Sequence, residues 1–372
     1  MYKYFPEQAK KNFSSKGKDI IQEIGTDIIK GVIFDVLTGK NLRDSTELLT
    51  RKRIITINAA TLTMLIKGSS TEKNFIGNLP STASQKLIQG KLKKDEKWLL
   101  EWILGLTDKG MQNILRDDTS GLEKYTNDYI AITKKAIEEF RNDYGELSGT
   151  IHLNSEEKAN LNWEFIIQLM TIVGSQTLAV RGSDKSKFGK LFEKLILGTL
   201  LKVLGFTMED PHALHKTDKV FWLSEREDKR ESDATLLYGK GKGVRFDIGF
   251  IGRGNPEISL DKVSRFEREI ELGRQKYYMA TIIIVDRVGP GSRIESLAEA
   301  INGHIVQMSG AYWPLAVAKI LKETVGYSNE ILNQNTETID NFLKKEMRNI
   351  SIEELLSIPF FNQTANLSSE EI

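Results

Sequence analysis

A run of apolar, mostly β-branched residues from Tyr278 to Asp286, YMATIIIVD, limits the possible folds more than any other segment. It has the length of a strand, and its apolar residues do not alternate with polar ones. Strands that read as continuous hydrophobic runs are buried on both faces, usually in a sheet with helices on each side. We therefore expect this run to form a strand that is buried on both faces.

The segments around this strand predict the rest of the sheet. ESDATLLYG (231–239) and VRFDIGFIG (244–252) flank KGKG and together predict a β-hairpin. A helix is expected before the hairpin, capped at Ser183 or Asp184 and ending at Gly205. A basic helix over 260–274 follows the hairpin, and a capping box of Ser292 and Glu295 opens another helix before the strand HIVQM (304–308). This order predicts an α/β fold with a mixed β-sheet flanked by helices.

The first 150 residues predict an N-terminal all-helical domain. Apolar residues recur at three- and four-residue spacing, as in amphipathic helices. The expected helices span residues 20–39, 46–66, 83–106 and 122–144, with a loop over 67–84. A further helix, capped at Ser155, is expected to run to about Val173. We predict three parts: residues 1–150 as the helical domain, 151–330 as the α/β domain, and 331–372 as a helical extension with a frayed end.

Charge and cysteine content exclude several classes of protein. Lysine and arginine number 52 against 51 aspartates and glutamates, a formal net charge of +1, so any nucleic-acid surface must be local. The sequence has no cysteine, which excludes disulfides, thiolate metal sites and thiol nucleophiles and fits a reducing compartment. No uninterrupted apolar run reaches the roughly 18 residues of a membrane span. We expect a cytoplasmic protein without membrane contact.

Motifs for several kinds of chemistry are absent from the sequence. There is no Gly-x-Ser-x-Gly elbow, no Walker loop, and no Gly-x-Gly-x-x-Gly between a strand and a helix. His212 and His215 form a close pair, but without a third ligand a solvated loop is a better interpretation than a zinc site. The chemistry must be sought among the carboxylates.

Two aspartates lie in the predicted hairpin, Asp233 in its first strand and Asp247 in its second. A tight hairpin can place residues at this spacing on neighbouring strands. Asp is depleted in strands, and burying an unpaired charge costs several kcal/mol, so a cation should compensate. A salt bridge is the structural alternative, and its possible partners are Arg245, Lys262 and Arg265. The functional alternative is a divalent metal held by both carboxylates. Position alone favours neither.

Glu193, on the helix before the hairpin, is a candidate third carboxylate. It lies beside Phe192 and Leu195 and away from the solvent stripe of the helix. An i,i+3 pair with Lys190 explains its position equally well.

The arrangement over about residues 155–310 resembles the PD-(D/E)XK nuclease superfamily. In that superfamily a helix precedes a hairpin, and an Asp on one strand and an acid-x-Lys on the next bind Mg²⁺. SKFGKLFEKLILGTLLKVLGF (186–206) and RESDATLLYGKGKGVRFDIGFIGRGNPEISLDKVSRFERE (230–269) are similar to a type II restriction endonuclease. NLRDSTELLTRKR (41–53) resembles the CfrBI-like family. The resemblance implies a restriction-endonuclease-like core behind the helical domain.

The resemblance also implies roles for individual residues. Asp233 would be the motif Asp, Asp247 the acid of the second strand, and both would bind Mg²⁺, with Glu193 as an accessory carboxylate. The position two residues after Asp247 departs from the pattern, because Gly249 stands where the motif has Lys. Lys262 is our choice for the replacing cation, and its rivals are Arg253 and Lys242. Glu257 is an alternative second acid.

Duplex DNA and a second copy of the chain are the partners that the resemblance implies, together with a cognate DNA methyltransferase. The residues that we expect at the DNA are Arg51, Lys52, Arg53, Lys91, Arg253, Asn255 and Arg265. A solvated helix face is the more common explanation for such basic residues in the helical part. The resulting prediction is Mg²⁺-dependent, site-specific double-strand cleavage. The rivals are an inert DNA-binding or scaffold protein on the same fold and a repair-type nuclease.

Overall fold

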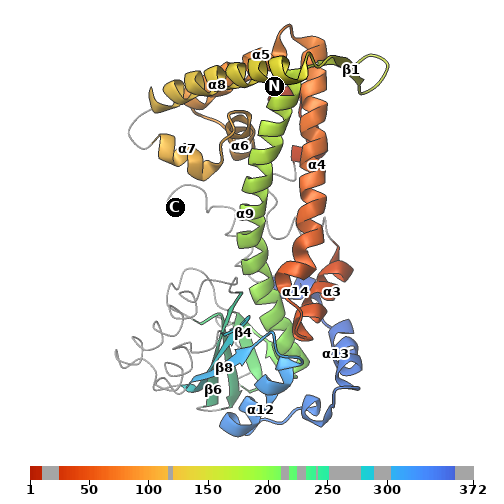
Figure 1. Cartoon of the computed structure of the whole chain (residues 1–372). Coiled ribbons are helices and arrows are strands. Elements are labelled where there is room, and N and C mark those ends of the chain that lie inside the picture. Colours follow the sequence, from red (N-terminus) through yellow and green to blue (C-terminus); the bar gives the residue numbers. More distant parts are fainter. Residues whose placement is uncertain are drawn as a thin grey trace. The chain divides into compact units, whose positions relative to one another are not determined.

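The computed structural model shows two compact units. It describes residues 1–10, 25–115, 120–210, 218–223, 232–239, 242–250, 278–288 and 303–356. One unit comprises Met1–Ser15 and Leu48–Lys185, and the other Lys16–Glu47 and Ser186–Ile372. The boundary falls inside two long helices, α4 (Leu42–Thr71) and α9 (Trp163–Val203), shown in Figure 1. It differs from the boundaries of the three predicted domains, whose roles remain a prediction.

The second unit contains a mixed six-stranded sheet in the order β3-β4-β5-β6-β7-β8. Its strands are β3 (Thr207–Met208), β4 (Val220–Leu223), β5 (Ala234–Gly239), β6 (Lys242–Gly249), β7 (Tyr278–Val285) and β8 (Gly303–Gln307). The β4–β5 and β5–β6 pairs are antiparallel, whereas β3–β4, β6–β7 and β7–β8 are parallel. The predicted α/β fold, a mixed sheet flanked by helices, is confirmed.

The apolar run YMATIIIVD forms β7, an interior strand next to the edge strand β8. It lies between β6 and β8, parallel to both. Ile282, Ile283 and Ile284 are fully buried, so both faces of the strand are covered. The predicted hairpin is β5–β6, and the predicted strand at HIVQM is β8. The short strands β3 and β4 were not predicted.

Helices cover this sheet and close the second unit. They include α3 (Thr26–Leu37), α12 (Trp313–Val325), α13 (Ile339–Arg348), α14 (Ile352–Leu356) and the 3₁₀ turn η2 (Glu330–Asn333). α9 comes so close to β4 and α14 that a Cβ on Gly198 would meet Leu355 at 2.8 Å and Leu223 at 3.4 Å. α12 packs on β7 and β8, and Trp313 Nε1 donates to Val36 O of α3 at 2.7 Å. α9 ends at Val203, and the predicted stop glycine, Gly205, follows in the left-handed region with φ +83°.

The first unit is mainly helical. Its elements are η1 (Tyr2–Tyr4), α1 (Glu7–Lys10), α5 (Phe75–Gln89), α6 (Lys94–Ile103), α7 (Asp108–Ile114) and α8 (Ser120–Tyr144), with parts of α4 and α9. Met64, Leu99, Trp102 and Phe165 lie in one apolar core. The predicted helix over 122–144 corresponds to α8. Of the predicted helix over 20–39, the described part contains α3, and residues 11–24 lie outside the description.

The predicted loop over 67–84 is wrong. α4 continues to Thr71, and α5 begins at Phe75 and contains Pro80. The predicted helix over 83–106 is instead divided between α5 and α6, with Gly90 between them at φ +69°. Phe75, Leu79, Pro80 and Ala83 are buried at helical spacing. Their burial in the core outweighs the local Gly, Ser, Asn and Pro signals on which the loop prediction was based.

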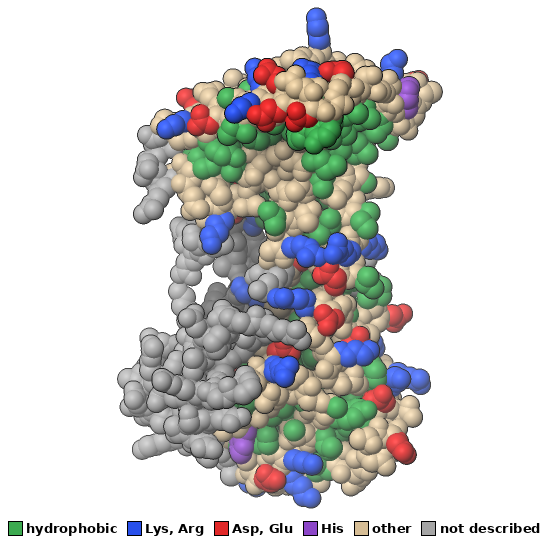
Figure 2. Space-filling model, in the orientation of Figure 1, with side chains coloured by type: hydrophobic (Ala, Val, Ile, Leu, Met, Phe, Trp, Pro, Cys, Tyr) green, Lys and Arg blue, Asp and Glu red, His purple; other side chains and the backbone are tan. Residues whose placement is uncertain are grey.

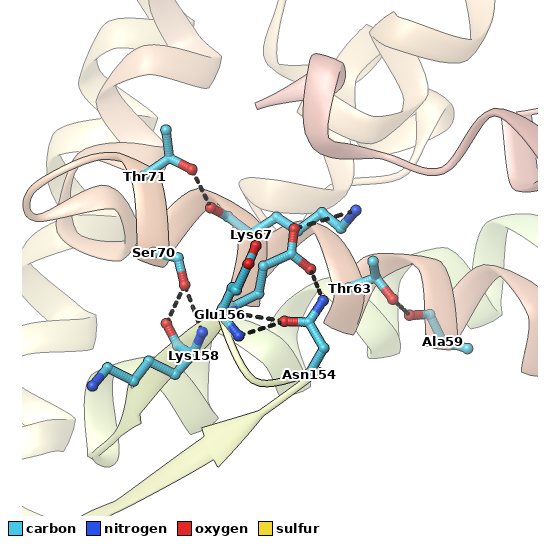
Figure 3. Close-up of polar contacts among 9 residues, drawn as sticks. Ala59, Thr63, Lys67, Ser70, Thr71, Asn154, Glu156 and Lys158 are labelled. Atoms are coloured by element: carbon cyan, nitrogen blue, oxygen red, sulfur yellow. Dashed lines mark hydrogen bonds and ion pairs between the residues drawn. The ribbon is translucent and has the colours of Figure 1, made fainter.

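The predicted helix start at Ser155 is also wrong, because the chain forms a hairpin of β1 (Gly149–His152) and β2 (Lys158–Leu161) there. Asn154 Oδ1 turns the chain by accepting from Glu156 N at 2.9 Å and Glu157 N at 2.7 Å. The hairpin is held against α4, as Figure 3 shows: Ser70 Oγ accepts from Lys158 N at 2.6 Å, and Lys67 Nζ lies 3.5 Å from Glu157 Oε1.

α9 begins after this hairpin and is continuous, so the predicted second cap at Ser183 or Asp184 is wrong as well. Asn162 supplies the N-cap, since its Oδ1 accepts from Phe165 N at 2.9 Å. α9 also contains an 18-residue stretch that is apolar enough for a membrane span. Core helices of soluble proteins pass the same test, so this property carries no membrane assignment.

Glu101 in α6 is expected to make the first unit less stable as the pH rises. Its side chain is fully buried, and desolvation raises its pKa from 4.5 to about 7 although Lys97 Nζ lies 3.5 Å from Oε1. Between pH 4.5 and about pH 7, Glu101 keeps its proton in the folded chain but has released it in the unfolded chain. The free energy of unfolding therefore falls as the pH rises. We expect a loss on the order of 2–3 kcal/mol between pH 4.5 and pH 8.

Denaturant unfolding across this pH range measures the loss. Glu101→Gln cannot ionise, and its unfolding free energy should fall less steeply with pH than that of the wild type. Equal slopes for the two proteins would show that the pKa of Glu101 is the same in the folded and the unfolded chain.

Candidate active site

The β5–β6 hairpin brings Asp233 and Asp247 together. Ala234 pairs with Phe246, so Asp233, which directly precedes β5, continues this register to a place opposite Asp247. Asp233 Oδ2 accepts from the backbone N–H of Ile248 at 2.8 Å. This bond holds the carboxylate of Asp233 beside the strand segment that carries Asp247. The two aspartates thus lie together, as the hairpin prediction required.

β6 exposes Asp247 very little, because the strand is buried on both faces. Val244, Phe246 and Ile248 are fully buried on one face. Arg245 and Asp247 alternate with them and so point to the opposite face, where their exposed fractions are 5% and 7%. The sheet therefore buries two opposite charges on one face of a single strand.

The face that carries Asp247 is polar over three adjacent strands. Arg245 lies opposite Thr235 on β5 and opposite Thr281 on β7, and both threonines are buried. The sequence predicts Arg245 only as a possible salt-bridge partner of Asp247. The Arg-x-Asp spacing on one strand was the available signal, but the burial of Arg245 depends on strands β5 and β7.

The other predicted catalytic residues are not gathered at this pair by the described structure. Lys262, Glu257, Arg253, Asn255 and Arg265 lie outside the described residues. Glu193 is half-buried on α9. In the described ranges, no group of three or more histidines and carboxylates is placed to hold a metal ion. Asp233 and Asp247 are therefore the part of the predicted site that the structure brings together.

Lys242, a rival for the role of the missing lysine, lies at the far end of the strand. It begins β6, and its Nζ lies 3.3 Å from Val325 O and 5.6 Å from the ring centre of Tyr238. Gly249 ends the strand and provides no side chain at the motif position.

The basic residues of the helical part divide into exposed and buried ones. Arg51 and Lys52 on α4 and Lys91 after α5 are exposed, as phosphate contacts require. Arg53 is mostly buried and pairs with Asp184 of α9, which is 2% exposed. On the face drawn in Figure 2, basic and acidic side chains are interspersed over the described residues. This pattern agrees with the balanced net charge.

The donor set at the aspartate pair suits a hard divalent cation. Mg²⁺ prefers oxygen ligands and is commonly bound by one or two carboxylates together with water and substrate phosphates. Asp247 on β6 and Asp233, the residue before β5, provide two carboxylates, and Asp233 is held in place by a backbone hydrogen bond. The residues present therefore fit such an ion.

Comparisons with known proteins agree on one family. The family model of the CfrBI restriction endonuclease matches residues 26–293, a range that contains both aspartates. The type II restriction enzyme CfrBI of Citrobacter freundii is 37% identical over 346 residues, which cover 91% of this chain and 94% of that enzyme. No solved structure matches the chain. The matches confirm the predicted resemblance to the CfrBI-like family, and the chain therefore belongs to the CfrBI restriction endonuclease family and is a DNA-cleaving hydrolase.

Proposed function

We propose that this restriction endonuclease makes site-specific double-strand cuts by Mg²⁺-dependent hydrolysis at Asp233 and Asp247. The observation that carries the proposal is the juxtaposition of these two carboxylates, with Asp233 Oδ2 bonded to Ile248 N at 2.8 Å. PD-(D/E)XK chemistry needs two acids on adjacent strands, and the β5–β6 hairpin supplies them.

In the hydrolysis, water forms a bond to phosphorus, the bond to one bridging oxygen breaks, and that oxygen takes up a proton. A divalent cation, when bound, lowers the pKa of the attacking water and stabilises charge on the phosphate. The chain's own backbone fixes the positions of the two carboxylates. Asp247 lies on a strand paired on both sides, and Asp233 is oriented by a backbone N–H, so both carboxylates are positioned before the substrate arrives.

Double-strand cleavage at a symmetric site favours a two-fold dimer with one active site for each strand. We infer such a homodimer here, together with a cognate methyltransferase in a restriction–modification system and a cytoplasmic location. Arg51, Lys52 and Lys91 are exposed and suit phosphate contacts, which would weaken with salt.

Incubation of the purified protein with plasmid and phage DNA, with and without Mg²⁺, tests the proposal. Discrete fragments that form only with Mg²⁺ are the expected result. Intact DNA in every lane, with folded protein, would instead support the inert binding or scaffold protein. A smear, or cutting confined to single strands, would support the repair-type nuclease.

A further inference from the structure

The PD-(D/E)XK motif proposed for this site requires a cation beside its second acid, Asp247. The geometry of β6 points to the residue that supplies this cation. Gly249, two residues after Asp247, has no side chain. Side chains alternate along a strand, so the residues two before and two after Asp247 share its face, each about 7 Å away along the strand. The residue two before Asp247 is Arg245. A cation therefore lies two residues before Asp247, on the same face of the strand, whereas the motif lysine is missing two residues after it.

The surroundings of Arg245 favour a functional charge. Only 5% of the residue is exposed, and its cross-strand neighbours are the neutral Thr235 and Thr281. Burying a guanidinium is costly unless an opposite charge compensates it. Asp247 carries such a charge on the same face of the same strand and is 7% exposed. The guanidinium and the carboxylate thus lie in one water-poor layer, where electrostatic interactions are stronger than in water.

From this placement we infer that Arg245 supplies the positive charge of the cleavage site in place of the motif lysine. The inference rests on the proposed function. A guanidinium stays protonated in proteins, so Arg245 cannot act as an acid or a base. Its planar N–H groups suit phosphate oxygens, and its role is to offset the negative charge that builds up on the phosphate during hydrolysis.

Two variants separate this role from a merely structural one. Arg245→Met removes the charge and keeps an unbranched apolar side chain, whereas Arg245→Lys keeps the charge. Thr281→Val is the matched control, because it changes a buried polar neighbour of Arg245 without touching a charge. Each protein is assayed for plasmid cleavage with Mg²⁺, for Ca²⁺ binding by calorimetry, and for thermal unfolding.

We expect Arg245→Met to cleave about 100-fold more slowly, in line with the loss of one charge-stabilising group. Its affinity for Ca²⁺ should equal or exceed that of the wild type, because a positive charge near the carboxylates has been removed. Arg245→Lys should recover at least a tenth of wild-type cleavage, and Thr281→Val should stay within about threefold of the wild type.

Several results would overturn the inference. Cleavage by Arg245→Met within threefold of the wild type would show that the charge is dispensable. A parallel loss of Ca²⁺ affinity and cleavage would show that Arg245 only supports the carboxylates, and so would Arg245→Lys cleaving no better than Arg245→Met. If the wild type itself leaves DNA intact with Mg²⁺, the proposed function fails instead.

Discussion

Asparagine at position 233 or 247 is expected to lower DNA cleavage by a factor of about a thousand or more while the fold is kept. Asn has the size of Asp, and the amide oxygen at position 233 can still accept the Ile248 N–H, so the hairpin should persist. The lost charge weakens the metal site, and metal ions contribute several kcal/mol to transition-state stabilisation. Each 1.36 kcal/mol is a tenfold change in rate.

Plasmid cleavage with saturating and limiting Mg²⁺ measures this loss, and Ca²⁺ binding measures the loss of metal affinity separately. Asp35→Asn is the matched control, because Asp35 is an ion-paired surface carboxylate of the same unit, 2.7 Å from Lys40 Nζ. It should cleave within about threefold of the wild type. Wild-type cleavage by Asp247→Asn would remove Asp247 from the site and make the loosely matched Glu257 the next candidate.

Strands β5 to β8 of the sheet could be predicted because their signals are local. β7 is a continuous apolar run, and β5–β6 are two strand-like segments around a glycine-containing turn. The juxtaposition of Asp233 and Asp247 follows from the hairpin alone. The same local signals failed in the first unit. Pro80 lies inside α5, and Ser155 lies in a hairpin turn, because burial of neighbouring side chains and an Asn154 turn decide those segments.

The burial and the partners of the charged residues could not be predicted from the sequence, because they depend on the tertiary structure. In the sequence, Arg245 and Asp247 are two residues apart and look like an ordinary salt bridge. Only the flanking strands β5 and β7 show that both are buried on one face of the sheet. Arg51, Lys52 and Arg53 likewise form one basic cluster in the sequence. Helical geometry exposes the first two and turns Arg53 toward Asp184, which is 131 residues away.

Arg53→Met is expected to lower the free energy of unfolding by about 3–5 kcal/mol, because it leaves the buried Asp184 without its ion-pair partner. The Arg53→Met/Asp184→Leu double variant should recover most of this loss, since apolar residues of similar size can replace a buried pair at little cost. Denaturant unfolding of both single variants and the double variant measures the coupling.

Lys52→Met provides the contrast, because Lys52 is exposed one position earlier on α4. Its unfolding free energy should change by less than about 0.5 kcal/mol, while its DNA affinity falls and depends less steeply on salt. If Arg53→Met instead keeps its stability and loses DNA affinity in the same way, Arg53 is a phosphate contact as the basic cluster predicted. In that case the ion pair with Asp184 would have to open when DNA binds.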